Sequence, residues 1–376
     1  MNDWIEKHAG AIAARAPREL EALVAVSSPS GDVHGADEAA AVAAALAPDE
    51  AEVERVPCSS ADHAPDLLVR LPGTGAKRLL LLGHLDTVIA HADHRPLRRE
   101  DDQLVGSGTV DMKGGDVLAL GALRALVERR ADFAEAALLL VCDEEWRVGP
   151  FQHVERFAGF DACLCFEGGQ RAKDGDEQVI VKRKAAGTVM VNATGRSAHS
   201  GSAPHRGINA LLALAGAAQA LAARHDPDGP EHLTVVPTVI RSGDAFNVVP
   251  DRGELVADVR ADSLDALRAV VAAVPDEIGG ARLDARLMRE WPGMDSRDAT
   301  VGLLERASAA IGRPIVAARR GGASDASHFA PSIPLTVDGL GPLGGGAHAP
   351  HEFVLASGLR PRAEVALAIA DAVLAD

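Results

Sequence analysis

The most constraining feature of the sequence is a pair of short apolar runs that each end in ionisable side chains. The first run, residues 79–82, consists of four leucines and is followed closely by His84 and Asp86. The second run, residues 136–142, stops at the acidic triplet 143–145. Uncharged runs of this length are typical of strands buried on both faces of a parallel sheet. Ligands collect outside the carboxyl ends of such strands, so we expect the polar groups that follow the two runs to share one crevice.

Length and composition place the chain among globular proteins of about two domains. It has 376 residues, of which 47% are apolar and 24% are charged. The net charge of −16 argues against nucleic acid or an anionic membrane as the main partner, because both are polyanions. The first residues show no signal-peptide pattern, and no apolar stretch is long enough to span a bilayer. We therefore predict a cytoplasmic enzyme.

The four cysteines are too few for a disulfide scaffold. Cys163 and Cys165 alternate along one predicted strand, which is typical of packing residues. A metal site of the Cys-x-Cys kind is the weaker alternative, because the sequence offers no second pair of ligands beside it. We predict that all four are reduced and pack inside the protein: Cys58, Cys142, Cys163 and Cys165.

The order of predicted elements indicates an α/β domain that is interrupted by a second domain. Strand and helix patterns alternate in residues 1–184 and return in residues 294–376, which predicts a discontinuous domain with a mixed, largely parallel sheet. Residues 185–293 instead follow the order β-α-β-β-α-β of a ferredoxin-like unit. Helices are predicted over 3–26, 35–47, 112–130, 209–223, 263–274, 300–311 and 360–374, and strands over 51–56, 67–71, 79–82, 136–142, 162–166, 187–194, 233–240, 254–260, 282–288 and 335–337.

Five side chains are candidate ligands for a pair of metal ions. Two-metal hydrolytic sites use about three protein ligands per ion, one of them a bridging carboxylate, so five groups suffice if Asp111 bridges. Asp86 is placed to accept a hydrogen bond from the second ring nitrogen of His84. Glu144, next to a ligand but not itself needed as one, is the candidate general base. The five candidate ligands are His84, Asp111, Glu145, Glu167 and His348.

The motifs around these residues resemble those of the co-catalytic di-zinc aminoacylase/carboxypeptidase family. That family includes glutamate carboxypeptidase, acetylornithine deacetylase and succinyl-diaminopimelate desuccinylase, and the carboxypeptidase G branch is the most similar. Five motifs occur in the family's order over nearly the whole chain: HLDTV at 84–88, GTVDMKGG at 108–115, DEE at 143–145, GRSAHSG at 195–201 and HAPHE at 348–352.

The resemblance implies a zinc-peptidase-like catalytic domain and a role for each candidate residue. One Zn²⁺ would take His84, Asp111 and Glu167. The other would take Asp111, Glu145 and His348, with Co²⁺ or Mn²⁺ as substitutes. Asp86 would orient His84, and Glu144 would be the base.

The family also implies that the inserted domain is a lid through which two chains form a homodimer. His199 of the Ala-His-Ser-Gly segment would then reach the neighbouring subunit's active site and stabilise the oxyanion.

Two residues of the inserted domain match the positions that bind substrate in the carboxypeptidase branch. Asn247 matches the position that binds the amide, and Arg260 the one that binds the carboxylate, which a guanidinium group suits well. The alternative for Arg260 is a surface salt bridge with Glu254 or Asp258 on the same strand face. Arg183 and Lys184 either supplement this charge or face solvent.

The predicted activity is hydrolysis of an amide bond in a small N-acyl amino acid or dipeptide-like substrate with a free carboxylate. An N-acyl amino acid deacylase of the acetylornithine or succinyl-diaminopimelate type is the alternative, and the sequence does not separate the two. A non-catalytic binding protein on the same fold is disfavoured, because Glu144 and the five candidate ligands are all present.

Three departures from the family pattern bear on the site. Glycine usually stands two residues after the second Glu of the acidic motif, whereas here Trp146, Arg147 and Val148 precede Gly149. His351 stands where Asn or Asp is usual. The polar stretch 168–177 predicts an added surface hairpin.

Overall fold

A computed structural model describes residues 2–375 and divides into two compact units. The large unit comprises the chain up to residue 182, residues 295–319, and the chain from residue 324 onward. The inserted unit comprises residues 183–294 with the short segment 320–323.

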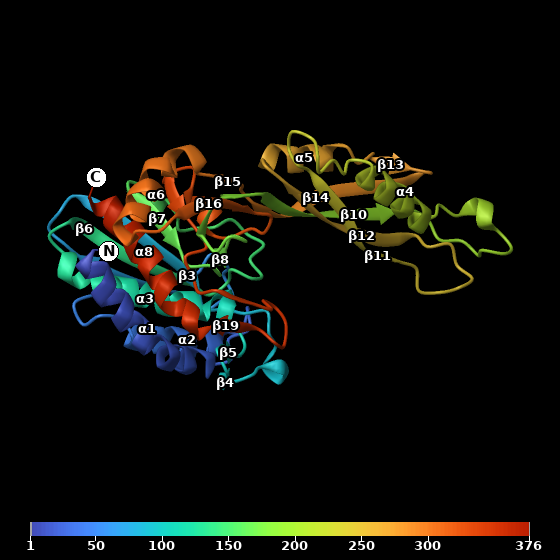
Figure 1. Cartoon of the computed structure of the whole chain (residues 1–376). Coiled ribbons are helices and arrows are strands. Elements are labelled where there is room, and N and C mark those ends of the chain that lie inside the picture. Colours follow the sequence, from blue (N-terminus) through green and yellow to red (C-terminus); the bar gives the residue numbers. More distant parts are fainter. Residues whose placement is uncertain (1, 376) are drawn as a thin grey trace. The chain divides into compact units, whose positions relative to one another are not determined.

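The large unit is built on a six-stranded sheet. In sheet order its strands are β1 (Glu52–Val56), β2 (Asp66–Pro72), β6 (Phe133–Val141), β3 (Lys77–His84), β7 (Ala162–Cys165) and β17 (Leu335–Val337). β3 is parallel to both of its neighbours, and β17 is parallel to β7. β1 and β2 extend the sheet by antiparallel pairing. The predicted α/β class with a mixed sheet is confirmed, and Figure 1 shows this sheet among helices.

Helices cover the sheet and bury its central strand. The four leucines of 79–82 are at most 1% exposed, as expected for a strand with helices on both faces. Asn2 and Asp371 are hydrogen-bonded, so the two ends of the described chain lie side by side (Figure 1). The helices are α1 (Asp3–Val24), α2 (Val33–Ala45), α3 (Gly114–Leu126), α6 (Arg297–Ile311), α7 (Ala326–Phe329) and α8 (Leu359–Leu374).

One predicted helix is shorter than expected. The sequence pattern predicted a helix over 112–130, but α3 begins at Gly114, because a π-helical turn, Thr109–Lys113, precedes it. Asp111 and Met112 have non-helical backbone angles in this turn. Asp111 therefore lies outside α3, in the turn just before the amino-terminal end of the helix.

Two small sheets were not predicted, because most of their strands have only two or three residues. Two longer strands, 177–183 and 315–320, do carry apolar residues but were not assigned from the sequence. One contains β15 (Met294–Asp295), β9 (Glu177–Arg183), β16 (Ile315–Arg320) and β8 (Gln170–Arg171). The other contains β18 (Gly344–Gly345), β19 (Phe353–Leu355), β5 (Gln103–Val105) and β4 (Arg98–Glu100).

The predicted hairpin at 168–177 is present, since β8 pairs antiparallel with the start of β9. It is not wholly a surface feature. Glu177 is 2% exposed and forms an ion pair with buried Arg362.

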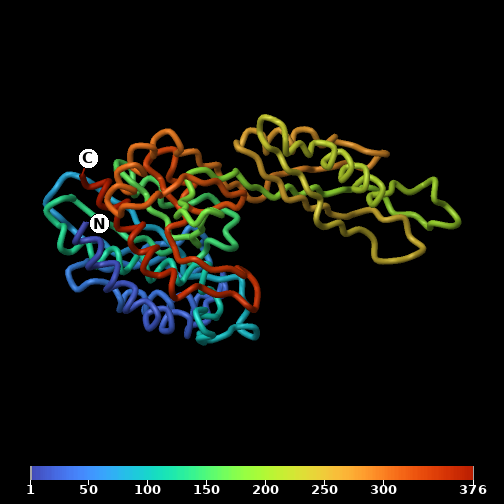
Figure 2. The backbone as a smooth tube through the Cα atoms, viewed as in Figure 1, coloured from blue at the N-terminus to red at the C-terminus, as the bar shows by residue number. Residues whose placement is uncertain are grey.

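The inserted unit is a five-stranded antiparallel sheet with two helices. In sheet order its strands are β11 (Thr234–Ser242), β12 (Arg252–Ala261), β10 (Ala185–Thr194), β14 (Ala281–Trp291) and β13 (Glu277–Ile278), and its helices are α4 (Ala210–Ala222) and α5 (Leu264–Ala272). Figure 2 shows this unit as the green-to-orange part of the chain. The alternation predicted for β12 holds, because Leu255, Ala257 and Val259 are buried among the helices. β11 is an edge strand, on which Val236 and Ile240 are exposed.

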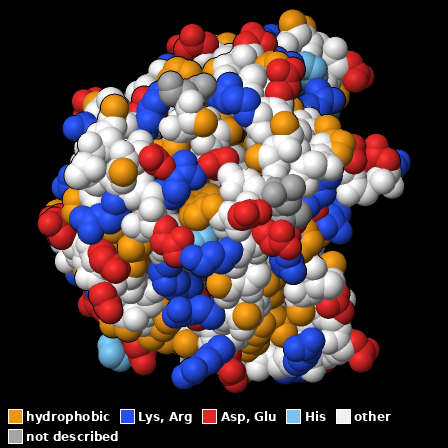
Figure 3. Space-filling view, turned by 60° about the vertical axis from the view of Figure 1, so that its left-hand side comes forward, with side chains coloured by type: hydrophobic (Ala, Val, Ile, Leu, Met, Phe, Trp, Pro, Cys, Tyr) orange, Lys and Arg blue, Asp and Glu red, His pale blue; other side chains and the backbone are white. Residues whose placement is uncertain are grey.

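Three further features of the structure concern its surface charges, its cysteines and the length of its helices. In the face that Figure 3 presents, acidic and basic side chains are intermixed. All four cysteines are free, and only Cys58 is partly exposed. Within residues 2–375, no helix is both long enough and apolar enough to cross a bilayer.

Candidate metal centre

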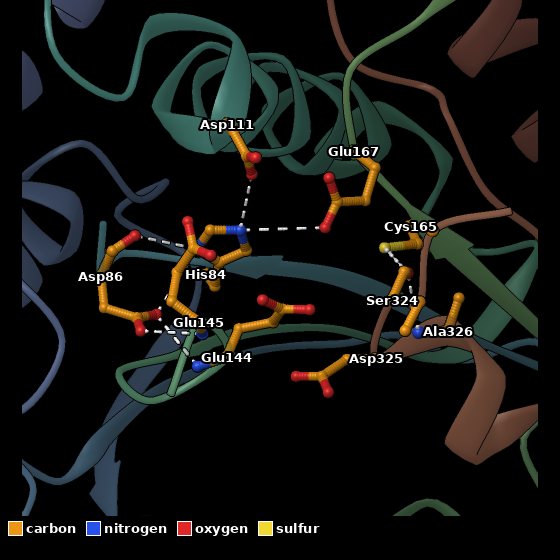
Figure 4. A network of polar contacts seen from close by, with 12 residues as sticks. His84, Asp86, Asp111, Glu144, Glu145, Cys165, Glu167, Ser324, Asp325 and Ala326 are labelled. Carbon is orange, nitrogen blue, oxygen red and sulfur yellow. Dashed lines mark hydrogen bonds and ion pairs between the residues drawn. The ribbon is translucent and has the colours of Figure 1, made fainter. Parts of the chain in front are cut away.

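Two neighbouring parallel strands deliver the first group of candidate ligands. His84 is the last residue of β3, and Glu167 follows the end of β7. The His84 Nε2 atom lies 3.1 Å from Asp111 Oδ1 and 3.8 Å from Glu167 Oε1 (Figure 4). The three side chains therefore converge at the carboxyl end of the sheet.

The second group shares Asp111 with the first. The His348 Nε2 atom lies 3.1 Å from Asp111 Oδ2 and 3.3 Å from Glu145 Oε2. Asp111 thus presents one carboxylate oxygen to each group, the arrangement that a bridging ligand requires. His348 has a φ of 64°, in the left-handed region, so its loop is held in an unusual conformation.

The chemistry of both groups fits divalent metal ions. In each group, the ligand atoms lie within 4.8 Å of one another. Glu145 Oε1 is buried and accepts no hydrogen bond from any described residue, so it has an unused lone pair inside the cluster. Imidazole nitrogens with carboxylate oxygens are a typical zinc donor set.

The electrostatics point the same way. Hydrogen bonds to Asp111 and Glu145 raise the pKa of His348 to about 10. Burial alone would raise the pKa of Asp111, but His348 and His84 hold it well below its usual range. Protons on the imidazoles thus balance negative charge that metal cations would otherwise balance.

The second ring nitrogen of His84 contacts Asp86 at both its backbone carbonyl and its carboxylate. The His84 Nδ1 atom is 3.0 Å from the Asp86 carbonyl oxygen and 3.4 Å from Oδ1. The Asp86 carboxylate accepts the backbone N–H groups of Glu144 and Glu145, each at 3.1 Å. Asp86 therefore fixes both the imidazole and the turn that carries the two glutamates.

Glu144 lies beside the two groups but belongs to neither. Its side chain faces the same space as His84 in Figure 4. Burial raises the pKa of Glu144 well above its usual range; His84 opposes this rise, and Asp325 adds to it. A buried carboxyl group whose pKa is raised is suited to accept a proton and to return it.

Sequence reasoning gave no role to Glu352, which holds the loop of Asp111. Glu352 is 2% exposed and accepts the backbone N–H groups of Gly108, Val110 and Asp111 at 2.9, 2.8 and 2.9 Å. It thereby ties the loop of His348 to that of Asp111. Its place at the end of the 348–352 motif was the only signal in the sequence.

In the inserted unit, His199 and Asn247 lie on two paired loops, and both are exposed. Ser200 N donates to the Asn247 carbonyl oxygen at 3.0 Å. The His199 Nδ1 atom accepts the N–H groups of Gly201 and Ser202 at 3.1 and 3.2 Å. The proton of the neutral ring is therefore on Nε2, which leaves that nitrogen as a donor.

Arg260 already has partners within the inserted unit. Its Nε and Nη2 atoms donate to the Asp258 carboxylate at 3.0 and 3.4 Å, and Nη1 donates to Gly321 O at 3.0 Å. A substrate carboxylate would have to compete with Asp258 for this side chain. Arg183 donates to Gly322 O and Lys184 to His232 O.

Comparison with known proteins gives a consistent family. The pattern of Peptidase family M20/M25/M40 matches residues 80–372. Carboxypeptidase G2 of Pseudomonas sp. (strain RS-16) is 29% identical over 353 residues, which cover 88% of this chain and 82% of the relative. A succinyl-diaminopimelate desuccinylase of Methylobacterium sp. (strain 4-46) is 30% identical over 348 residues, covering 85% and 87%.

The fold is likewise shared with a solved structure. The YXEP protein of Bacillus subtilis, a dinuclear metal-binding peptidase of the M20 family, matches with a TM-score of 0.70 at 16% identity. The match covers 96% of this chain and 98% of that protein.

Proposed function

Since the chain belongs to Peptidase family M20/M25/M40 and is thus a metal-dependent hydrolase, we propose that it binds two zinc ions and cleaves an amide bond, as a glutamate-carboxypeptidase-like enzyme. The observation that carries this proposal is Asp111, whose two oxygens each face one group of candidate ligands. His84 and Glu167 would hold one ion, and Glu145 and His348 the other. Co²⁺ or Mn²⁺ would serve as substitutes.

The residues around the ligands have distinct tasks in this reaction. Bound divalent cations supply Lewis-acid polarisation of the amide carbonyl and lower the pKa of water. Glu144 accepts the proton of the attacking water and returns it to the leaving amine. Asp86 keeps His84 in one tautomer, because the Asp86 carbonyl oxygen lies 3.0 Å from His84 Nδ1.

His199 supplies the remaining charge stabilisation. Its Nε2–H would donate to the oxyanion that forms from the amide carbonyl. We propose that it does so in the site of a second chain, with the inserted unit as lid and dimer interface. The exposed apolar residues Val236 and Ile240 on edge strand β11 support such an interface.

The substrate is a small N-acyl amino acid or dipeptide-like molecule with a free carboxylate. Arg260 would bind the carboxylate by its guanidinium fork in exchange for Asp258, and Asn247 would bind the amide. We propose a cytoplasmic location, since such substrates are small metabolites.

Deacylation of N-acyl amino acids is the second candidate activity. This activity is supported by the desuccinylase relative, because its sequence identity to this chain is similar to that of the carboxypeptidase relative. The two activities differ only in which side of the amide is small.

The test is hydrolysis by the metal-depleted chain after reloading with Zn²⁺, Co²⁺ or Mn²⁺. Dipeptides and N-acyl glutamates are compared with N-acetyl and N-succinyl diamino acids, each as the free acid and as its α-carboxamide. We expect metal-dependent cleavage with a strong preference for the acid, which Arg260→Ala largely removes. The proposal fails if the reloaded chain cleaves none of these amides.

Cleavage with an acid preference that survives Arg260→Ala would leave Arg260 as a structural partner of Asp258. The search for the carboxylate site would then move to Arg183, Lys184 and Arg206.

A further inference from the structure

An arginine is buried directly behind the turn that carries Glu144. The Arg147 side chain is 1% exposed, and its Nη1 and Nη2 atoms donate to the two oxygens of Asp325, both at 2.7 Å. Its Nε atom donates to Asp143 Oδ1 at 3.1 Å. One guanidinium group thus uses its fork on one carboxylate and its remaining N–H on another.

The Arg147 contacts close the turn at both ends. Asp143 begins the turn, its carbonyl oxygen accepts Arg147 N at 2.9 Å, and its Oδ2 accepts Ser60 N at 2.9 Å. Glu144 and Glu145 lie in the chain between Asp143 and Arg147. Asp86 holds their N–H groups from a third direction. The turn of the candidate base is therefore held by groups from three other segments, namely the Ser60 N–H group and the side chains of Asp86 and Asp325.

The segment that carries Asp325 is itself hydrogen-bonded through its neighbour Ser324, so the ion pair connects the turn to an anchored segment. Ser324 Oγ donates to Asp338 Oδ2 at 2.8 Å and accepts Ala326 N at 3.2 Å. It also lies 3.7 Å from Cys165 Sγ on β7. Figure 4 shows Asp325 on this segment, with its carboxylate next to that of Glu144.

The surroundings of Arg147 demand a planar group. Its Cζ atom lies 4.5 Å from the ring centre of Phe151, which stacks on His328 at 5.0 Å. A lysine would keep the charge but could neither bridge both oxygens of Asp325 nor lie flat on Phe151. Ion pairs buried this deeply are often replaceable by apolar residues without loss of stability. Stability alone therefore does not account for this pair.

We propose that Arg147 and Asp325 are positioning residues for the reaction, and that their ion pair holds the Glu144 turn in its working geometry. This inference rests on the proposed function, because it assigns a purpose to the position of Glu144. It also gives the departure of Trp146, Arg147 and Val148 from the family pattern a physical meaning. Arg147 stands at the position where glycine is usual in that pattern and adds a side-chain anchor there.

The test uses Asp325→Asn, Arg147→Lys and the apolar double variant Arg147→Met/Asp325→Leu. For all three we expect unchanged metal content, a KM within about twofold of the parent and a kcat lowered about 10- to 100-fold, since small misplacements of a reacting group have effects of this size. The double variant should regain part of the melting temperature that the single changes lose, because Asp143 still loses its bond from Arg147, but it should not regain the kcat. Recovery of kcat together with the melting temperature would overturn the proposal.

A matched control is Arg124→Lys, which weakens a partly buried ion pair with Glu19 on α1, outside the candidate site. It should lower the melting temperature without changing kcat. A fall in kcat similar to that of Arg147→Lys would show a general stability effect and count against the proposal.

Amide hydrogen exchange tests this inference independently of the proposed function, because it measures the turn directly and needs no enzymatic activity. The amides of residues 143–147 should exchange at least about tenfold faster in Asp325→Asn, while amides of the inserted unit stay unchanged. If the parent hydrolyses no amide but this local change occurs, the proposed function fails and the anchor stands. If the parent is active and the amides and kcat are unaffected, the anchor is wrong.

Discussion

The candidate residues of the large unit and those of the inserted unit are held in opposite ways. His84, Asp86 and Glu144 are buried, and each lies at the end of a sheet strand or is held by groups that come from other segments. His199 and Asn247 are exposed, on loops of an antiparallel sheet that contact each other within the inserted unit. The large unit thus has its polar geometry built in, whereas the inserted unit presents donors to solvent.

This difference has a physical origin in the two sheets. The carboxyl ends of parallel strands meet at one edge and bring residues from β3 and β7 together without further help. An antiparallel sheet with one solvated face has no such edge, so its functional groups need a second surface to work on. We infer that the groups for metal binding and proton transfer are prepared in the large unit, and we propose that the inserted unit supplies recognition and the oxyanion donor His199.

The largest expected effect is that of Glu144→Gln. The variant should keep its metal ions, because neither group of candidate ligands includes Glu144. Its activity should fall about 10²- to 10⁴-fold, the usual contribution of a general base. Elemental analysis and steady-state kinetics of the purified variant measure both.

Glu145→Gln is the matched control for this change. It alters the neighbouring residue in the same way but removes a candidate ligand, so it should deplete metal. Metal loss from the Glu144 variant with retention in the Glu145 variant would exchange the two roles.

A smaller loss, about a hundredfold, is expected for His199→Ala, since an oxyanion donor contributes about that much. If His199 acts in the neighbouring site, mixing His199→Ala chains with Glu144→Gln chains should restore part of the activity. A hybrid dimer would contain one site with both groups intact. Activity is measured after subunit exchange has been demonstrated by mass.

The control mixture pairs His199→Ala with a chain that carries both changes, and no recovery is expected there. The shared site is ruled out if the first mixture recovers no more activity than this control.

The smallest expected effect is the release of about one proton from His348 when metal binds. The pKa of His348 is raised to about 10 in the metal-free protein, so its imidazole is charged at neutral pH. A metal ligand must be neutral, so ion binding should release about one proton from His348. The apparent metal affinity should therefore rise with pH, by up to about tenfold per pH unit below that pKa.

Calorimetry in buffers of different ionisation enthalpy measures the released protons. His348→Ala should release fewer of them than the parent. An affinity that does not depend on pH near neutrality would remove His348 from the ligand set.

The sequence predicted the parts of the fold that have strong local patterns. The apolar run at 79–82 and the alternation at 254–260 identified β3 and β12, since burial on both faces leaves a continuous apolar run and burial on one face leaves an alternation. The strands β4 and β18 escaped notice, because they have three and two residues and no apolar period. The late start of α3 was also hidden, since nothing in the residue types marks the turn at Asp111.

For the candidate site, the sequence predicted the candidate ligands but not the residues that hold them in place. His84 and Glu145 follow apolar runs, so the sequence already places them at strand ends. Glu352 and Arg147 form hydrogen bonds with residues 241 and 178 positions away in the chain. From sequence alone, a charged residue after a strand is usually predicted to be exposed to solvent. Contacts of this kind become visible only when the chain is folded.

The central claim is that one carboxylate, Asp111, serves two metal sites, and a count of bound metal tests it most directly. Zn²⁺ is titrated into the metal-depleted parent, Asp111→Asn and Glu167→Gln, and bound ions are measured by elemental analysis after equilibrium dialysis. We expect two ions in the parent, about one in Glu167→Gln, and weakened binding at both sites in Asp111→Asn, because only Asp111 belongs to both groups. A parent that binds one ion, or an Asp111→Asn variant that keeps two ions with unchanged affinity, would contradict the account.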